Sequence, residues 1–309
     1  MASRVKEYYE QALIGRDFFT APELDRTFGY AVAESIYELL KDYESPTLLE
    51  LGAGNGTLAY DILHYYLRTY PEFYQRLSYY IYDFSPSLID LQKRRLRSFE
   101  GKVFWVQELF PLEGVVFSNE FFDCLPVHVV KGDKELFLVD GQEVWLELDK
   151  DEVKAFLKRM GYDGLPYRVE VCLECVEFLK KVAQNIRRGY HLVIDYGYTS
   201  DQLYRFPEGT VVGYKKGKVV GIKEDQSDLS AWVNFSALEE YGKDFGLETL
   251  YIKNLRDFLL SSGVFMKELE HLSLSEKPED IERLSRLKTM LLSMGDRFKV
   301  MLQKKLQNP

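Results

Sequence analysis

Short apolar runs and amphipathic stretches follow one another along most of the chain. The run TLLEL, starting at Thr47, predicts a buried strand, and residues 57–70 carry apolar positions at helical spacing. SYYIYDF, ending near Phe84, predicts a second strand, and SPSLIDLQKRRL predicts a helix that Ser85 caps. This alternation is typical of an α/β protein with a doubly wound, mostly parallel sheet.

The same pattern continues further along the chain, with two changes of character. The first 45 or so residues look helical, and residues 199–228 lose periodicity, which predicts a long loop or small subdomain. The last ~75 residues look helical again. Three more strands, one hairpin and one helix are expected, at residues 103–107, 114–120 and 190–198 for the strands, 136–148 with an Asp140-Gly141 turn for the hairpin, and 172–188 for the helix.

Composition narrows the class of protein. The chain has 309 residues, of which 46% are apolar and 15% aromatic, so a packed globular core is expected. A formal net charge of −9 weighs against a nucleic-acid partner and suits a cationic substrate. No run approaches the roughly 18 apolar residues of a membrane span, and no signal or transit segment is evident at the start. With three cysteines, reduced thiols in a cytoplasmic protein are the simplest interpretation.

A glycine-rich loop follows the first buried strand, in Gly52-Ala53-Gly54-Asn55-Gly56-Thr57. A dinucleotide-binding loop has its third glycine, or an alanine, at the position of Thr57, and a phosphate-binding P-loop ends in Gly-Lys-Ser/Thr. The sequence matches neither pattern. Glu50 is an awkward neighbour for a pyrophosphate but a suitable one for the cationic amino-acid part of S-adenosylmethionine (SAM). Asp83 would then hold the ribose hydroxyls. SAM is therefore the favoured ligand, ahead of a plain strand-turn-helix with incidental glycines.

Glu50-x-Gly52-x-Gly54-x-Gly56 resembles motif I of class I SAM-dependent methyltransferases. An ordered set of further stretches resembles one branch, the MidA-like family, which includes the mitochondrial complex I assembly factor. The stretches are GRDFFTAPELDRTFG, DFSPSLIDLQ, SNEFFDCLPVHVV, LVIDYGY, SDLSAWVNFSAL, RDFLLSSGV and MGDRFKVM. One difference is VVGYKKGKVVG, which keeps a basic character but lacks the histidine that similar proteins tend to have there.

The resemblance implies a Rossmann-like methyltransferase sheet with helical insertions, SAM as cofactor and S-adenosylhomocysteine as product. It also implies symmetric dimethylation of an arginine in a respiratory complex I-type subunit. Residues 1–45 would form a helical lid segment, residues 46–200 the SAM-binding core with its inserted hairpin, and residues 201–309 a substrate-side loop with the C-terminal helices. The expected cofactor-binding residues are Glu50, Gly52, Ala53, Gly54, Gly56, Thr57, Asp83, Phe84, Gln107, Glu108 and Asn119.

Carboxylates are needed if the nucleophile is an arginine, because a cationic guanidinium must approach a cationic sulfonium. They can offset that repulsion and clamp the planar group. Glu120 is the first candidate and Asp123 the second, although they could merely end a strand and cap a turn. The expected substrate-side residues are Thr20, Pro22, Glu23, Phe122 and Asp195; Thr20 and Glu23 could equally form a capping box.

No metal site is expected. A single CxxC, at Cys172 and Cys175, offers two of the four ligands that zinc needs, so a buried helix face is favoured. A protein substrate that presents an arginine is the expected partner, and the oligomeric state is open, with a homodimer compatible. The competing functions are methylation of another protein residue or a small molecule, a SAM-binding assembly factor with little catalysis, and, more distantly, an NAD-dependent oxidoreductase.

Overall fold

The structure is a computed structural model that describes residues 2–4, 21–139, 142–215, 218–220 and 228–306. Its contacts group the chain into two compact units that are interleaved along the sequence. The first unit comprises residues 1–18, 121–180 and 196–242, and the second comprises residues 19–120, 181–195 and 243–309. The division into residues 1–45, 46–200 and 201–309 stays a prediction.

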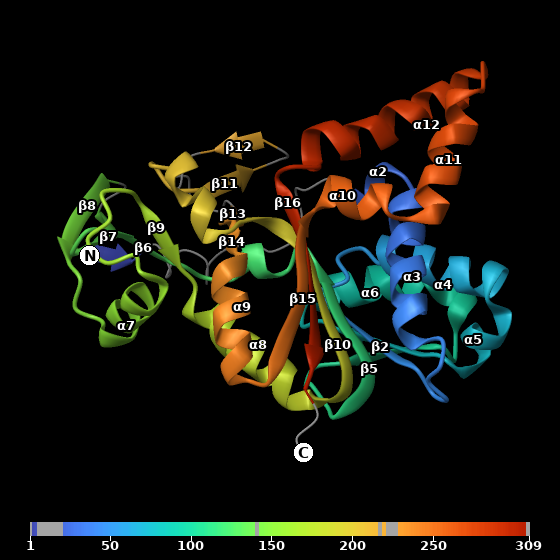
Figure 1. Ribbon diagram of the computed structural model, residues 1–309, viewed down its shortest axis with the longest axis horizontal. Coiled ribbons are helices and arrows are strands. Elements are labelled where there is room, and N and C mark those ends of the chain that lie inside the picture. The colour runs from blue at the N-terminus through green and yellow to red at the C-terminus, as the bar shows by residue number, and fades with distance from the viewer. Residues whose placement is uncertain (1, 5–20, 140–141, 216–217, 221–227, 307–309) are drawn as a thin grey trace. The chain divides into compact units, whose positions relative to one another are not determined.

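The second unit is built on a large sheet with the strand order β15-β16-β10-β5-β2-β3-β4. Figure 1 labels five of these strands, from β15 to β2. Adjacent strands from β10 to β4 pair in parallel, whereas β15 and β16 are antiparallel. The expected doubly wound, mostly parallel sheet is thus confirmed. The strands are β2 (Thr47–Leu51), β3 (Ser78–Tyr82), β4 (Val103–Val106), β5 (Leu112–Asn119), β10 (Ile186–Tyr198), β15 (Leu247–Asn254) and β16 (Phe298–Lys305).

The central strands are apolar along their whole length because helices cover parallel sheets on both faces. Leu48, Leu49 and Leu51 of β2 are all fully buried. Ser85 caps α6 as expected, since its hydroxyl accepts the backbone N–H of Leu88. The helical elements in this stretch are α2 (Ala21–Leu24), α3 (Thr27–Leu40), α4 (Thr57–Thr69), α5 (Pro71–Arg76), α6 (Pro86–Arg95) and the 3-10 turn η1 (Arg97–Phe99).

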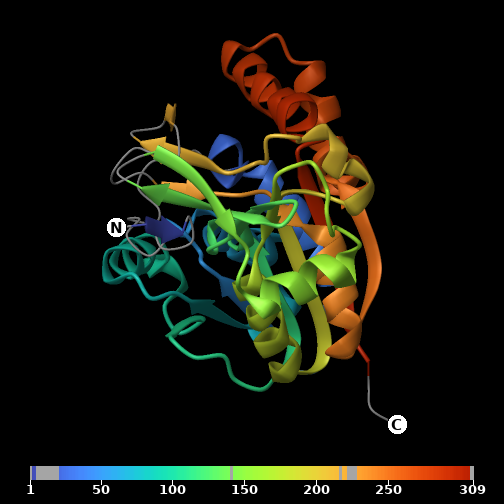
Figure 2. The same ribbon diagram turned by 90° about the vertical axis from the view of Figure 1, so that its left-hand side faces the viewer.

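The end of the chain differs from the expected run of helices, because it also supplies the antiparallel strands β15 and β16 to the sheet. The helix α11, which lies between these two strands in the sequence, packs against α3 and α12 (Figures 1 and 2). Arg283 of α12 makes an ion pair with Asp25, at 3.0 Å from Nε to Oδ2, which ties this helix to the segment before α3. The elements are α10 (Leu255–Leu260), α11 (Gly263–Ser273), α12 (Pro278–Thr289) and the π-helical η4 (Met290–Met294).

The first unit contains two small sheets, with the orders β1-β7-β6-β9 and β12-β11-β13. The predicted hairpin is confirmed, because β8 pairs with β7 up to Val139 and Gln142; its turn lies outside the described residues. The elements are β1 (Ala2–Arg4), η2 (Phe122–Cys124), β6 (His128–Lys131), β7 (Lys134–Val139), β8 (Gln142–Glu147), α7 (Asp151–Met160), β9 (Val169–Val171), α8 (Leu173–Asn185), η3 (Ser200–Arg205), β11 (Val212–Lys215), β12 (Lys218–Val220), β13 (Asp228–Ser230), β14 (Val233–Asn234) and α9 (Phe235–Asp244).

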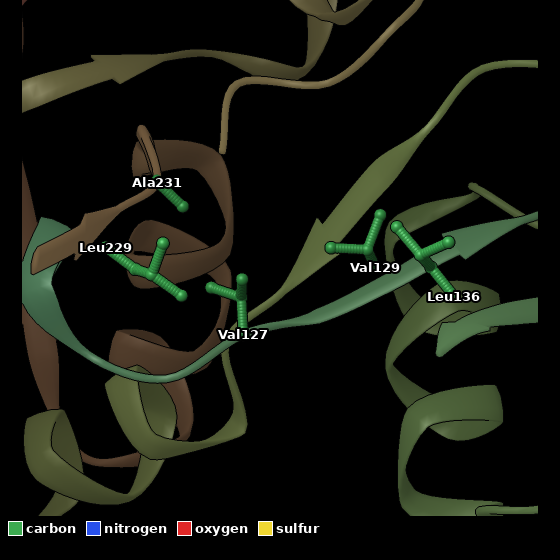
Figure 3. Close-up of a cluster of buried hydrophobic side chains, with 5 residues drawn as sticks. All are labelled: Val127, Val129, Leu136, Leu229 and Ala231. Atoms are coloured by element: carbon green, nitrogen blue, oxygen red, sulfur yellow. The ribbon is translucent and has the colours of Figure 1, made fainter. Parts of the chain in front are cut away.

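A compact apolar cluster holds the first unit together (Figure 3). It joins the strands β6 and β7 to the segment around β13, and all its members are at most 5% exposed. Residues 199–228, for which a long loop or small subdomain is expected, contain the short strands β11 and β12 and the first residue of β13, and these strands pair in a small sheet. The members of the cluster are Val127, Val129, Leu136, Leu229 and Ala231. Among the described residues, no helix has the length and apolar character needed to cross a bilayer.

Candidate cofactor and substrate site

The carboxyl ends of the parallel strands meet at one edge of the large sheet. The chain passes from β2 outward to β3 and β4 and then returns to β5 on the other side of β2, which makes this edge a topological switch point. The ladder continues one residue past β2 and β5, since Gly52 N–H donates to Tyr82 O and Glu120 N–H donates to Ile194 O, both at 2.9 Å. Ligands of open α/β sheets bind at such a point.

The glycine loop between β2 and α4 leaves room beside its backbone. Gly52, Gly54 and Gly56 have φ values of 65°, 53° and 83°, which residues other than glycine rarely adopt. A Cβ built on Gly54 would meet no atom of the described residues within 4 Å, so these residues leave space beside it. Asn55 stabilises the turn, because its Oδ1 accepts the backbone N–H and hydroxyl of Thr57 at 3.1 and 2.7 Å. Thr57 is thus held at the first position of α4, and its role in binding the cofactor stays a prediction.

Asp83 follows β3 and is 9% exposed. Its Oδ1 accepts the backbone N–H of Ser85 at 3.0 Å, and its Oδ2 accepts Gln92 Nε2 at 2.7 Å. Phe84, next in the chain, has a 58% exposed ring packed edge-on to Tyr82. The carboxylate is thus held by protein donors, with an exposed ring beside it. After β4, the expected cofactor-binding residues Gln107 and Glu108 are both exposed.

Glu50 lies in β2 with 2% exposure and accepts the hydroxyl of Tyr79 at 2.7 Å. Burial raises the pKa of this carboxyl from its ordinary 4.5 to about 8, and the charge of Asp83 adds to the rise, whereas the Tyr79 hydrogen bond opposes it. A cationic ligand nearby would favour the ionised form. Glu50 is therefore suited to a positively charged cofactor and poorly suited to a pyrophosphate.

Glu120 has an unusual backbone. Its φ of 53° makes it the one residue other than glycine with positive φ in the described part of the chain. Its Oε1 accepts Asn119 Nδ2 at 3.2 Å and the N–H of Ala21 at 3.4 Å. Within the same described residues, the buried Asn119 Oδ1 has no hydrogen-bond partner. Left-handed backbone costs energy and concentrates at functional sites, so it singles out this strand end.

The other expected substrate-side residues have different surroundings. Glu23 of α2 is exposed and accepts a hydrogen bond from Asn55 Nδ2, which brings α2 to the glycine loop, whereas Pro22 is buried. Asp195 is fully buried in β10. Thr20 lies outside the described residues, so neither it nor its capping box can be placed.

Asp123 and Phe122 belong to the first unit, unlike Glu120. Asp123 is 4% exposed, and its Oδ2 accepts the hydroxyl of Ser230 at 2.7 Å. Burial raises the pKa of its carboxyl, while the Ser230 hydrogen bond lowers it. Phe122 is 1% exposed and packs edge-on to Phe178. Both side chains thus have partners within their own unit, and their roles in a site stay predictions.

The expectation of reduced thiols is wrong for two of the cysteines. Cys172 and Cys175 form a disulfide at the start of α8, with their Cα atoms 5.2 Å apart. The physical reason is that a spacing of three residues at a helix start brings the two Cα atoms within the range that a disulfide spans. The same pairing leaves no thiolate there to bind zinc. The described residues contain no cluster of three or more metal-ligating side chains.

The site residues fit SAM. A cationic ligand with a ribose suits the buried carboxyl of Glu50 and the carboxylate of Asp83. It also suits the space that the described residues leave at Gly54 and the Asn119 Oδ1 acceptor, which has no partner among them. Together with the strand order, they define a class I SAM-dependent methyltransferase.

Comparisons with known proteins agree with this class. Residues 31–253 match a family described as "Putative S-adenosyl-L-methionine-dependent methyltransferase", and the chain belongs to this family. A crystal structure of a protein from Burkholderia thailandensis bound to S-adenosyl-homocysteine is similar over 100% of this chain and 89% of that one, with 25% identity and a TM-score of 0.82. The SAM cofactor and the Rossmann-like fold expected from the sequence are thus confirmed.

The curated relatives that the chain matches include proteins named for arginine methylation. The chain is 28% identical to the protein arginine methyltransferase NDUFAF7 homolog, mitochondrial, of Drosophila melanogaster over 77% of this chain and 63% of the relative. It is 28% identical to protein arginine methyltransferase NDUFAF7, mitochondrial, of Mus musculus, over 96% of this chain and 77% of that protein. The chain thus spans under two thirds of the Drosophila relative. Because these relatives are named mitochondrial, the expectation of a cytoplasmic protein is wrong. That expectation rested on the lack of a recognisable targeting segment and on the interpretation of the cysteines as reduced thiols.

Proposed function

We propose that the chain is a protein arginine N-methyltransferase, with Glu120 as the residue that holds the guanidinium. The observation that carries the proposal is the strained backbone of Glu120, which fixes a carboxylate beside the switch point of a SAM-dependent methyltransferase. The names of the relatives support the substrate class. The resemblance set out from the sequence adds symmetric dimethylation and a subunit of respiratory complex I type as the target.

The chemistry explains why a carboxylate is needed. SAM supplies an electrophilic methyl group on a sulfonium. A guanidinium that is to attack it must come close to a positive charge and must lie in line with the methyl group. The carbon–nitrogen bond would form as the carbon–sulfur bond breaks, S-adenosylhomocysteine would leave, and the proton of the nitrogen would pass to solvent. The carboxylate of Glu120 would offset the positive charge and orient the planar group through paired hydrogen bonds. Asp123 and Glu23 are further carboxylates for the substrate side. The proposed set is completed by Thr20, Pro22, Phe122 and Asp195.

The test begins with the wild-type protein, labelled SAM and a lysate, followed by mass spectrometry of the methylated residues. We expect methylated arginine in a protein, with symmetric dimethylarginine as product. The identified substrate then serves to compare Glu120→Gln with wild type at saturating SAM. Loss of the charge should lower turnover by about 10²-fold or more, while SAM affinity changes little.

Glu113→Gln is the matched control. It makes the same change at an exposed residue near the opposite end of β5, and its turnover should equal that of wild type. Wild-type turnover in Glu120→Gln would contradict the role of this carboxylate. Label on another residue type or on a small molecule would replace the arginine proposal, and SAM binding without any transferred label would favour an assembly factor.

A further inference from the structure

Gln92 of α6 is a buried polar side chain in the middle of the cofactor site, and the functional assignment above gives it no role. It is 0% exposed. Its Nε2 donates to Gly54 O at 2.9 Å and to Asp83 Oδ2 at 2.7 Å, and its Oε1 accepts Trp105 Nε1 at 2.9 Å. One side chain therefore joins the glycine loop after β2, the carboxylate after β3 and the strand β4.

The orientation of this carboxamide follows from its partners. An indole N–H can only donate, so the end that faces Trp105 must be the oxygen. The nitrogen end then faces two acceptors, the carbonyl of Gly54 and the carboxylate of Asp83. Both amide hydrogens have protein partners, so Gln92 has no donor left for a ligand. Any effect on the cofactor must pass through the groups that it holds.

The glycine loop also packs on the backbone of this residue. A Cβ added to Gly56 would lie 3.3 Å from Gln92 Cα, which is tight. The loop thus approaches α6 closely at Gly56 and is hydrogen-bonded to it at Gly54. A change at Gln92 would release both the loop carbonyl and one oxygen of Asp83.

We propose that Gln92 is a positioning residue that sets the affinity for SAM by fixing the Gly54 carbonyl and the Asp83 carboxylate relative to each other. A fixed pair needs no ordering when the cofactor binds, so less of the binding energy is lost. The inference rests on the assignment of SAM to this site and is independent of arginine as substrate.

The first test is calorimetric titration of Gln92→Met with SAM and with S-adenosylhomocysteine, in the absence of a protein substrate. This variant keeps the length of the side chain and removes its hydrogen bonds. We expect both dissociation constants to rise by roughly ten-fold or more, since two positioned groups are released. In turnover assays the KM for SAM should rise while kcat changes little. Affinity within about two-fold of wild type would overturn the proposal.

A second variant separates positioning from general damage to the fold. In Gln92→Glu, a carboxyl faces Asp83, and two carboxylates at hydrogen-bond distance cannot both be ionised comfortably. At low pH a shared proton keeps the link, and at high pH repulsion breaks it. The ratio of the variant's SAM dissociation constant to that of wild type should therefore rise by about ten-fold or more between pH 6 and pH 9.

The charged groups nearby do not imitate this effect. Lys93, Arg95 and Glu50 are present in both proteins, so the added carboxyl is the one titratable group by which the two proteins differ. Leu91→Glu is the control, because it adds a carboxyl at an exposed neighbour on the same helix. Its ratio should stay flat with pH. If the ratio of dissociation constants for Gln92→Glu does not change with pH, positioning through Asp83 is refuted. If the wild-type protein does not bind SAM, the assignment of SAM to this site is refuted.

Discussion

The buried carboxyl of Glu50 gives the protein a pH dependence that one substitution should remove. In the folded chain its pKa is raised to about 8, chiefly by burial, against an ordinary value of 4.5. Folding therefore takes up a proton between these two pH values. The contribution of Glu50 to the free energy of unfolding is greatest below about pH 4.5 and is lost as pH rises through about 8.

The size of the effect follows from the pKa difference. One unit corresponds to about 1.4 kcal/mol, so the loss across this window is on the order of 5 kcal/mol. This is an upper bound, because relaxation and entering water reduce the penalty of a buried charge. Glu50→Gln keeps the shape and can still accept the hydroxyl of Tyr79, but it cannot ionise. The variant should be more stable than wild type at pH 9 and equally stable or less stable at pH 5.

The assay is denaturant unfolding of both proteins at pH 5, 7 and 9, with Glu113→Gln as an exposed control. The affinity of both proteins for SAM is then measured by titration at the same pH values. Ionised Glu50 attracts a cationic ligand, so wild-type affinity should rise toward pH 8, and the affinity of Glu50→Gln should be weaker and flat. The same pH slope of stability in both proteins would refute the account of this carboxyl.

Two further predictions concern the glycine loop and the C-terminal helices. Gly54→Val should abolish SAM binding with the circular dichroism spectrum preserved, because the side chain enters the open space beside a backbone at φ 53°; normal affinity would remove this loop from the site. Arg283→Met should lower the free energy of unfolding by about 2 kcal/mol or more, since it leaves Asp25 buried without its main cation. Burial by itself would raise the pKa of Asp25, but hydrogen bonds from Arg283 and Thr27 hold it below 3.8. The stability lost in Arg283→Met, measured by denaturant unfolding, should therefore shrink as pH falls below about 3.8. A loss of stability that does not change with pH would contradict this.

The first half of the sheet is predictable from the sequence because its signals are local. The run from Thr47, the glycine loop and the Ser85 cap each specify their structure within a few residues, and parallel strands with both faces buried appear as continuous apolar runs. The strand ends then follow from topology. The sequence alone therefore suffices to place Glu50, Asp83 and Glu120 at one edge of the sheet.

The antiparallel strands β15 and β16 escape prediction because their pairing joins residues more than 40 positions apart, and the amphipathic helices between them dominate the pattern. Leu247, the first residue of β15, pairs with Lys305, the last residue of β16. Such a register is a tertiary property. The disulfide of Cys172 likewise depends on the conformation at the helix start.

Gln92 escapes prediction for a different reason. A glutamine within helical periodicity usually faces solvent, and nothing local shows that three separate segments converge on it. The one signal in the sequence is its position beside apolar neighbours in DFSPSLIDLQ. The left-handed backbone of Glu120 has no sequence signal, because glutamate carries no preference for that conformation.

The central claim is that the loop from Gly52 to Gly56, with Glu50 and Asp83, binds SAM. Calorimetric titration of the wild-type protein with SAM, S-adenosylhomocysteine and NAD tests it most directly, with Gly54→Val measured in parallel. The account predicts saturable binding of SAM and S-adenosylhomocysteine, no comparable binding of NAD, and loss of SAM binding in the variant. Preference for NAD, or equal SAM affinity in wild type and Gly54→Val, would contradict it.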